Sequence, residues 1–134
     1  MKLLLRTFSV AIGLLAGICA NSQSREYDVF IPISKYISQG NTEALAAWFS
    51  NNLDVSVLAQ GGNSSKRQAI QLVGSFFDTH TPRSFSITHT AGRANMKYAL
   101  GNLSAGGENY LVTIFVSLKN DSYRIQQLKI ERVQ

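Results

Sequence analysis

Positions 110–118 read Tyr-Leu-Val-Thr-Ile-Phe-Val-Ser-Leu, and this segment carries the clearest strand pattern of the chain. Large apolar residues stand at every second position, which is the period of a β-strand with one buried face. Two earlier segments, Phe85–Ala91 and Met96–Leu100, alternate in the same way. The part of the chain from Arg83 onward therefore predicts the strands of a sheet.

The last strand, over residues 123–131, changes its alternation midway. Tyr123 and Ile125 share one parity, whereas Leu128 and Ile130 share the other. One extra residue in the strand restores a single apolar face, so we predict a β-bulge near Gln126. The preceding Asn120-Asp121 pair is typical of a tight hairpin turn.

The residues before this strand region predict three helices. Apolar residues from Val29 to Ile37 recur at helical spacing and end at Gly40, with Pro32 in the opening turn, where proline is tolerated. Asn41 is a good cap for a second short helix containing Leu45, Ala46, Trp48 and Phe49.

A third helix is expected after a short strand. Leu53, Val55 and Val57 alternate with polar residues and predict the strand, and a turn is expected at 61–63. Ser65 precedes Gln68 at capping-box spacing, and the helix is expected to stop by Thr81, before a proline. The predicted order is α-α-β-α-β-β-β-β, an α+β fold in which three N-terminal helices pack on a curved antiparallel sheet.

Residues 1–22 have the layout of a secretory signal peptide. A basic start is followed by an apolar stretch and by small residues at 20–22, and the apolar run is too short for a membrane span. We expect an exported protein, periplasmic or extracellular, whose single domain covers residues 23–134. The alternative is a lipid anchor on Cys19, the only cysteine, although Ile18 precedes it where the lipidation signal usually has a small residue.

The charge pattern argues against a nucleic-acid partner. The formal net charge of +5 includes Lys2 and Arg6 of the leader, and the other basic residues are scattered along the chain. A nucleic-acid surface requires clustered basic residues with interleaved aromatic side chains. The single cysteine allows no disulfide within the chain, so stability must come from packing.

Segments spread along residues 31–131 resemble a known family. They are Ile31–Ile33, Tyr36–Asn41, Leu45–Phe49, Lys66–Ala69, Phe76–Phe77, Pro82–Phe85, Tyr98–Gly101 and Leu128–Glu131. The chain is similar to an uncharacterised bacterial family of small secreted proteins within the nuclear transport factor two-like superfamily of cone-shaped, cystatin-like domains. The resemblance implies the cone-shaped α+β fold and no particular activity. The catalytic members of the superfamily share no motif that maps onto this chain, so no catalytic residue is carried over.

His89 is the most interesting candidate for chemistry. Simple alternation places it on the same face as Phe85 and Ile87, the face expected to line the inside of the cone. A histidine there can act as a general base or bind a ligand, but it is more simply explained as a partly buried residue bonded to a backbone carbonyl or to a tyrosine. Tyr98, Trp48 and Phe77 are the other candidate pocket residues.

Other polar residues support a site less well. Asp78 and His80 stand two apart at the end of the third helix and would point to different faces, and His80 is a good C-terminal residue for that helix. Asp54 has the solvent-facing parity of its strand, and Tyr110 has the parity of its large apolar neighbours. We expect no metal site, because two histidines nine residues apart lack acidic residues at ligand spacing, and no cofactor.

These observations leave two hypotheses for function. The first is a secreted, non-enzymatic domain that binds a small apolar ligand or a protein partner, with a possible homodimer through the outer face of the sheet at Leu111, Thr113 and Phe115. The second is a small isomerase, dehydratase or hydrolase that uses His89 in the cone. An open pocket in which His89 and a second ionisable group converge distinguishes the enzyme from the binding domain.

Overall fold

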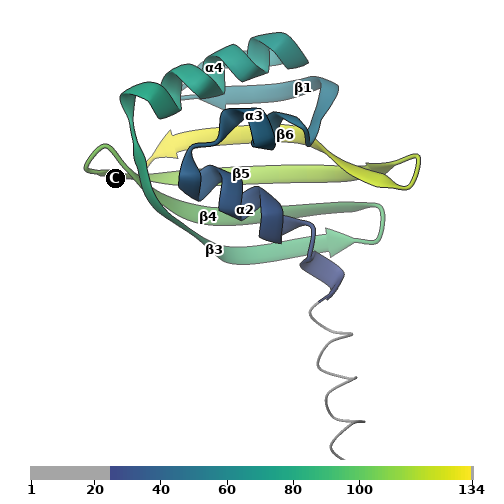
Figure 1. The fold of residues 1–134 in the computed structure, drawn as a ribbon. Coiled ribbons are helices and arrows are strands. Elements are labelled where there is room, and N and C mark those ends of the chain that lie inside the picture. Colours follow the sequence, from purple (N-terminus) through teal and green to yellow (C-terminus); the bar gives the residue numbers. More distant parts are fainter. Residues whose placement is uncertain (1–24, 134) are drawn as a thin grey trace, which may run out of the picture.

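The computed structural model describes residues 25–133, which form helices on one face of a six-stranded sheet (Figure 1). The elements are η1 (Arg25–Tyr27), α2 (Phe30–Gln39), α3 (Thr42–Ala46), β1 (Phe49–Val57), β2 (Gln60–Ser65), α4 (Lys66–Thr79), β3 (Pro82–Arg93), β4 (Met96–Ala105), β5 (Glu108–Lys119) and β6 (Ser122–Arg132). The α+β class is confirmed. The predicted signal peptide over residues 1–22 and the candidate lipidation site at Cys19 lie outside the described residues.

The strands lie in the order β2-β1-β6-β5-β4-β3, so the first hairpin is added beside the last strand of the chain. Neighbouring strands are antiparallel except β1 and β6, which run parallel. Segments distant in sequence therefore meet in the middle of the sheet.

The helix boundaries follow their local signals. α2 ends at Gly40, which has φ 65° and is therefore in the left-handed conformation that favours glycine. Ser65 and Gln68 form the predicted capping box at the start of α4. Asn41 caps α3 by accepting a hydrogen bond from the N–H of Ala44. However, α3 ends at Ala46, and the prediction that it includes Trp48 and Phe49 is wrong, because β1 already begins at Phe49.

The predicted turn at 61–63 is wrong, because these residues belong to β2. The chain turns instead at Leu58 and Ala59, which have positive φ angles of 52° and 69°. Gly61 is needed within the ladder rather than for a turn, since a Cβ there would lie 2.3 Å from the Val55 carbonyl oxygen. A glycine in a strand often marks such a close backbone approach.

Bulges in β6 and β3 determine which residues face the helices. In β6, Phe115 pairs with Gln127 and Val116 pairs with Ile125, so Gln126 is the extra residue and the predicted bulge is confirmed. In β3 a second bulge lies between Ile87 and His89, and the sequence analysis did not anticipate it.

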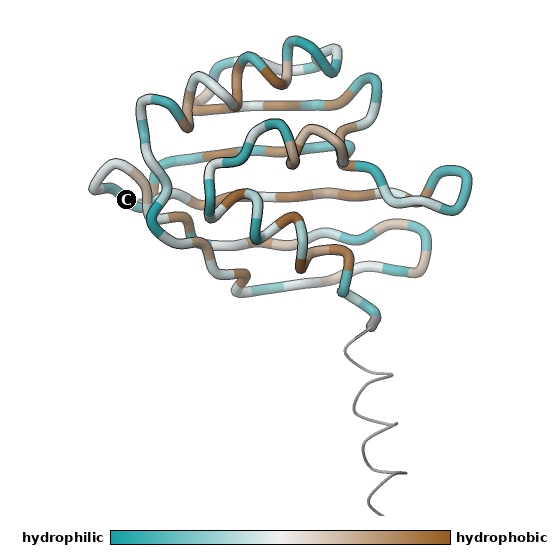
Figure 2. Tube along the Cα trace, viewed as in Figure 1, coloured by the Kyte–Doolittle hydropathy of each residue, from teal (hydrophilic) through white to brown (hydrophobic). Residues whose placement is uncertain are grey.

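The core lies between the helices and the sheet. It contains apolar residues of α2 and α4, such as Ile33 and Phe76, and alternate residues of β5, such as Val112 and Ile114, all of them buried. Hydrophobic residues follow the strands, whereas the loop between β5 and β6 is hydrophilic (Figure 2). This packing accounts for a stable domain without a disulfide.

Lys97 is a buried cation on the helix-facing side of β4, with 5% of its surface exposed. Its Nζ lies 5.0 Å from the centre of the Tyr27 ring in η1 and 6.0 Å from that of Tyr123 in β6. Such cation–π contacts stabilise a partly desolvated ammonium group. Lys97 therefore links η1 to the sheet.

Candidate functional site

The predicted pocket on the helix-facing side of the sheet is occupied by side chains. Phe76 and Phe77 of α4 are buried in the core, and Trp48 packs against its edge. The ring of Phe76 packs against those of Phe77 and Tyr110 at centroid distances of 5.9 Å and 5.2 Å. Phe77 and Trp48 thus act as packing residues in this structure.

His89 does not lie on the helix-facing side, and the prediction that it shares a face with Phe85 and Ile87 is wrong. The β3 bulge shifts the register by one residue, so His89 pairs with Leu100, whose neighbours Ala99 and Gly101 are buried on the opposite face. A shift of one residue moves a side chain to the other face of a sheet. His89 is exposed there, and its ring centre lies 6.3 Å from that of Tyr98.

Tyr98 also lies on this outer face, as do Leu111, Thr113 and Phe115, which are all half-buried. Tyr98 pairs with Phe115 across β4 and β5. The candidate residues are therefore divided between the two faces of the sheet, with Phe77 and Trp48 on one and His89 and Tyr98 on the other. A dimer through the outer face stays a prediction.

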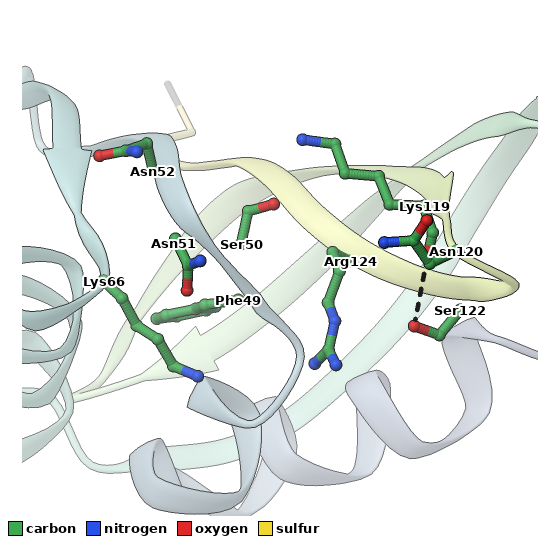
Figure 3. Close-up of a pocket in the computed structure, with 9 residues that line it drawn as sticks. All are labelled: Phe49, Ser50, Asn51, Asn52, Lys66, Lys119, Asn120, Ser122 and Arg124. Carbon is green, nitrogen blue, oxygen red and sulfur yellow. Dashed lines mark hydrogen bonds between the residues drawn. The ribbon is translucent and has the colours of Figure 1, made fainter.

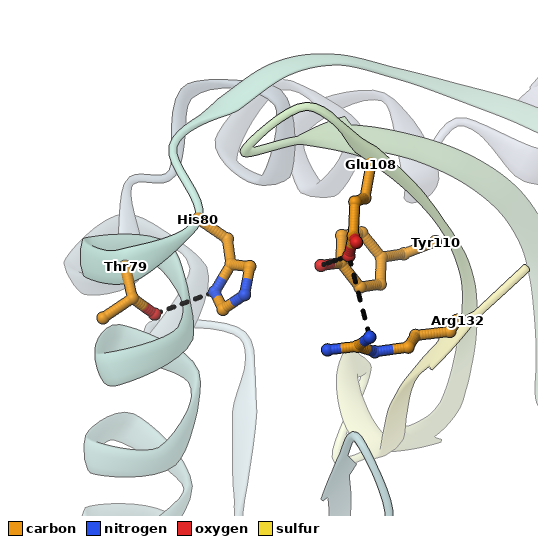
Figure 4. Close-up of polar contacts among 5 residues, drawn as sticks. All are labelled: Thr79, His80, Glu108, Tyr110 and Arg132. Carbon is orange, nitrogen blue, oxygen red and sulfur yellow. Dashed lines mark hydrogen bonds and ion pairs between the residues drawn. The ribbon is translucent and has the colours of Figure 1, made fainter.

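A polar cluster lies where α4 ends and β5 begins (Figure 4). The Tyr110 hydroxyl donates a 2.9 Å hydrogen bond to Glu108 Oε2, which lies 4.0 Å from Arg132 Nη1. Burial, followed by the hydrogen bond to Glu108 and its charge, raises the pKa of Tyr110 above its usual 10.0. These polar contacts therefore lie at the end of the hydrophobic core, where the buried Tyr110 ring meets the surface.

His80 is part of the same end of the molecule and has a structural role. Its ring stacks on Phe76 at 4.5 Å, and Nδ1 lies 2.8 Å from Thr79 Oγ1. Its backbone N–H donates to the Phe76 carbonyl and so caps α4, as the helix signals predict. Asp78, two residues earlier, is exposed and lies outside this set of contacts.

A groove lies where β1 separates from β6. Phe49 pairs with Ile125 and Asp54 pairs with Gln127, so β1 advances five residues while β6 advances two. The additional residues of β1 cannot all join the ladder, and they leave a gap beside β6. Irregularities of this kind are common next to functional sites.

The gap opens into a groove of about 690 Å³, which Figure 3 shows with its lining side chains. Three cations from separate elements line it: Lys66 at the start of α4, Lys119 at the end of β5 and Arg124 in β6. The remaining lining residues are uncharged: Phe49, Ser50, Asn51, Asn52, Asn120 and Ser122. We call this depression the cationic groove.

Arg124 is held in place by the backbone. Its Nη1 donates a 2.6 Å hydrogen bond to the Ala47 carbonyl, which precedes β1. Nearby, the Ile125 N–H donates to the Trp48 carbonyl, and Gln126 donates to the Ser50 hydroxyl at 2.7 Å. Because a guanidinium has five N–H donors, this anchoring leaves others for an anion.

The chemistry of the cationic groove suits an anionic group. Arginine and lysine form strong hydrogen bonds to carboxylates and phosphates, and a concave surface of one charge sign concentrates its field. Asparagine amides and serine hydroxyls supply further donors. The sequence analysis missed this site because its cations lie in no motif. Lys119 and Arg124 flank the β5–β6 hairpin, but Lys66 is distant from both in sequence.

In the described part of the chain, no three His, Cys, Asp or Glu residues lie close enough together to hold a metal ion.

Within residues 25–133 there is no helix with the length and apolar character that a membrane crossing requires.

Solved structures of several proteins share this fold, at sequence identities that show the fold alone. A cystatin-like domain of unknown function from Nostoc punctiforme has a TM-score of 0.63 and 14% identity, and the match covers 86% of this chain and 78% of that one. An NTF2-like protein of unknown function from Silicibacter pomeroyi has a TM-score of 0.60 and 14% identity, covering 85% and 98%. The protein thus has the NTF2-like, cystatin-like α+β fold.

The family is shown by sequence. The model of the Domain of unknown function (DUF4783) matches residues 30–131, and the chain belongs to this family. A DUF4783 protein from Bacteroides uniformis superimposes with a TM-score of 0.73 and 22% identity, covering 77% of this chain and 95% of that one. No curated protein matches the chain. The resemblance inferred from the sequence is confirmed, and it assigns no activity.

Proposed function

We propose that this protein is an exported, non-enzymatic binding domain that holds an anionic group of its ligand in the cationic groove. The observation that supports this most directly is that Lys66, Lys119 and Arg124 all line one groove, with no carboxylate among the described residues that line it. Like charges that line one groove without a counter-charge repel one another, and an anionic ligand relieves that repulsion.

The placement of the candidate catalytic residues supports binding rather than catalysis. A general base must lie within hydrogen-bond reach of the proton that it abstracts from a bound substrate, so it needs a site that holds the substrate beside it. His89 is exposed on the outer face, and its described aromatic neighbour is Tyr98. Phe76 and Phe77 fill the side of the sheet where the enzyme hypothesis required an open pocket.

Export rests on the leader pattern of residues 1–22. We expect the secreted chain to begin near Gln23, and an intact-mass measurement on protein recovered from the producing cells tests this. A mass that includes residues 1–22 would contradict export with cleavage. A mass increased by lipid, on a chain beginning at Cys19, would support the anchored alternative.

The anion proposal is tested by titrating inorganic phosphate into ¹⁵N-labelled protein and following the amide signals. We expect the largest shifts at Asn51, Asn120 and Arg124. Lys119→Gln should weaken binding by about tenfold, as the loss of one charge-assisted hydrogen bond of about 1.5 kcal/mol would do. Lys119 is exposed, so the fold should not change.

The matched control is Lys35→Gln, which removes an exposed lysine of α2 that does not line the groove. It should leave the phosphate titration unchanged. Equal losses in the two variants would mean that phosphate responds only to net charge, and the proposed site would be withdrawn. Amide signal shifts dispersed over the whole surface would also mean that phosphate binds at no particular site, and the proposed site would be withdrawn.

A further inference from the structure

A second groove, of about 560 Å³, lies between α3 and α4 and shares Lys66 with the cationic groove. On the α4 side it is lined by Lys66, Ile70, Gly74 and Asp78. These residues are four apart and therefore follow one line along the helix surface. We call this line the α4 stripe.

The charges of the α4 stripe stand at the wrong ends of the helix for stability. Lys66 is the first residue of α4 and Asp78 is the last but one, and α4 has no acidic residue in its first turn and no basic residue in its last. A helix dipole favours anions at the N-terminus and cations at the C-terminus. The folded helix alone therefore gives no reason for this arrangement of charges.

Gly74 also lowers the stability of α4 without a packing reason. Glycine is among the least favourable residues inside a helix. A Cβ at Gly74 would lie 3.6 Å from Thr42 Cγ2, which is an ordinary contact distance, so alanine fits. The missing methyl group keeps the groove wider at its centre. Beside it, Ile70 exposes 36% of its surface.

Lys66, Gly74 and Asp78 are thus each unfavourable for the stability of α4, and all three lie on the α4 stripe, which borders the groove. Such violations are expected where a site, rather than stability, determines the residues. The groove has a cation at one end, and it has Glu43 and Asp78 among its lining residues beyond the apolar middle. Its charge pattern is complementary to a chain with an acidic end and a basic end.

We propose that this groove binds an extended peptide segment of a partner protein. Its acidic end contacts Lys66, small apolar residues lie over Gly74, and a basic residue contacts Asp78 and Glu43. The inference rests on the proposed function, because the acidic end continues into the cationic groove. The stripe runs from Lys66 to Asp78, twelve helical steps of about 1.5 Å, and is therefore about 18 Å long, which corresponds to roughly five residues of extended chain.

The test uses blocked synthetic peptides and ¹⁵N-labelled protein. The probes are Asp-Asp-Ala-Ala-Ala-Lys, its reverse, and Ala-Asp-Lys-Asp-Ala-Ala, which has the same composition without separated charges. We expect one of the ordered peptides to bind at least about tenfold more tightly than the scrambled one and to shift the signals of Ile70, Gly74 and Asp78. Equal affinities would overturn the proposal.

A pair of α4 variants separates groove shape from helix stability. Gly74→Ala should raise the melting temperature, weaken peptide binding several-fold and leave phosphate binding unchanged. Ser75→Ala, on an exposed neighbouring position outside the groove, should leave both ligands bound as in the wild type. If Gly74→Ala binds the ordered peptide as tightly as the wild type does, the groove is not the docking site.

The two proposals fail in different ways. Phosphate binding in the cationic groove without preference for ordered peptides overturns the peptide groove and retains the anion site. Preferential binding of an ordered peptide without phosphate binding overturns the anion site and retains the peptide groove. If sedimentation instead shows a dimer that Gly74→Ala dissociates, a second copy of the chain occupies the groove, and the partner peptide is excluded.

Discussion

The Gln126 side-chain amide donates a 2.7 Å hydrogen bond to the Ser50 hydroxyl, across the gap where β1 separates from β6. Gln126 is the bulged residue of β6, and Ser50 belongs to the β1 segment that leaves the ladder. Ser50 is 6% exposed. This bond therefore joins two irregular segments that together form the cationic groove.

Ser50→Ala is expected to destabilise the protein by about 1–2 kcal/mol, because it leaves the Gln126 amide without its partner in a half-buried place. Urea denaturation measures this change. Ser122→Ala, at an exposed position of the same groove, should change stability by less than about 0.5 kcal/mol. In a double-mutant cycle with Gln126→Ala, additive effects would show that the two side chains do not act together.

The helices and the last strands could be predicted because their signals are local. The capping box at Ser65, the stop at Gly40 and the parity change around Gln126 each lie within a few residues of the feature that they determine. By contrast, the position of His89 depends on a bulge in β3. The serine, threonine and alanine residues around that bulge are found on either face of a strand, so they give no signal of the register shift. Alternation alone then assigns the wrong face.

The cationic groove could not be predicted for a different reason. It depends on the parallel pairing of β1 with β6, two strands that have five other elements between them in the sequence, and on a register in which β1 has extra residues. A β-bulge was predicted near Gln126 from β6 alone, but its counterpart in β1 has no sequence signal. Lys119 and Arg124 already flank the β5–β6 hairpin, but Lys66 joins them at the groove only after this pairing forms.

Gly101→Ala is expected to destabilise the domain by about 1–3 kcal/mol, because the position is already fully packed. A Cβ there would lie 2.5 Å from Phe85 Cζ and 2.8 Å from the Ser86 carbonyl oxygen. The Phe85 ring can turn, but the backbone oxygen belongs to the β3–β4 ladder. Thermal and urea denaturation should show the loss, and Gly74→Ala, which meets only an ordinary contact, should show a gain. Equal stability of both variants would contradict the packing argument.

Stability should fall at alkaline pH through Tyr110. Its folded-state pKa is raised above 10.0 by burial first and then by Glu108. The folded protein therefore retains the phenol proton more tightly than the unfolded chain, and this contribution is complete below pH 10. It is lost as the pH rises above 10 through the folded-state pKa.

Denaturation curves of the wild type and Tyr110→Phe across this pH range measure the effect. The variant lacks the hydrogen bond to Glu108 and should be less stable at neutral pH, but it should lose less stability above pH 10. Because lysines and other tyrosines titrate in both proteins, the difference between the two curves isolates Tyr110. Parallel curves would show that this phenol does not couple to folding.

Ala59→Gly should stabilise the protein by about 0.5–1 kcal/mol, since the turn after β1 imposes a left-handed backbone on a residue with a Cβ. Ala59 has φ 69°, is exposed, and follows Leu58, which also has a positive φ. Leu58 packs against the core and is left unchanged, so only the backbone strain at Ala59 is relieved. The matched control is Ala44→Gly within α3, which should destabilise by a similar amount because that backbone is helical. Urea denaturation compares the two variants, and a loss of stability in both would show that the turn imposes no strain on Ala59.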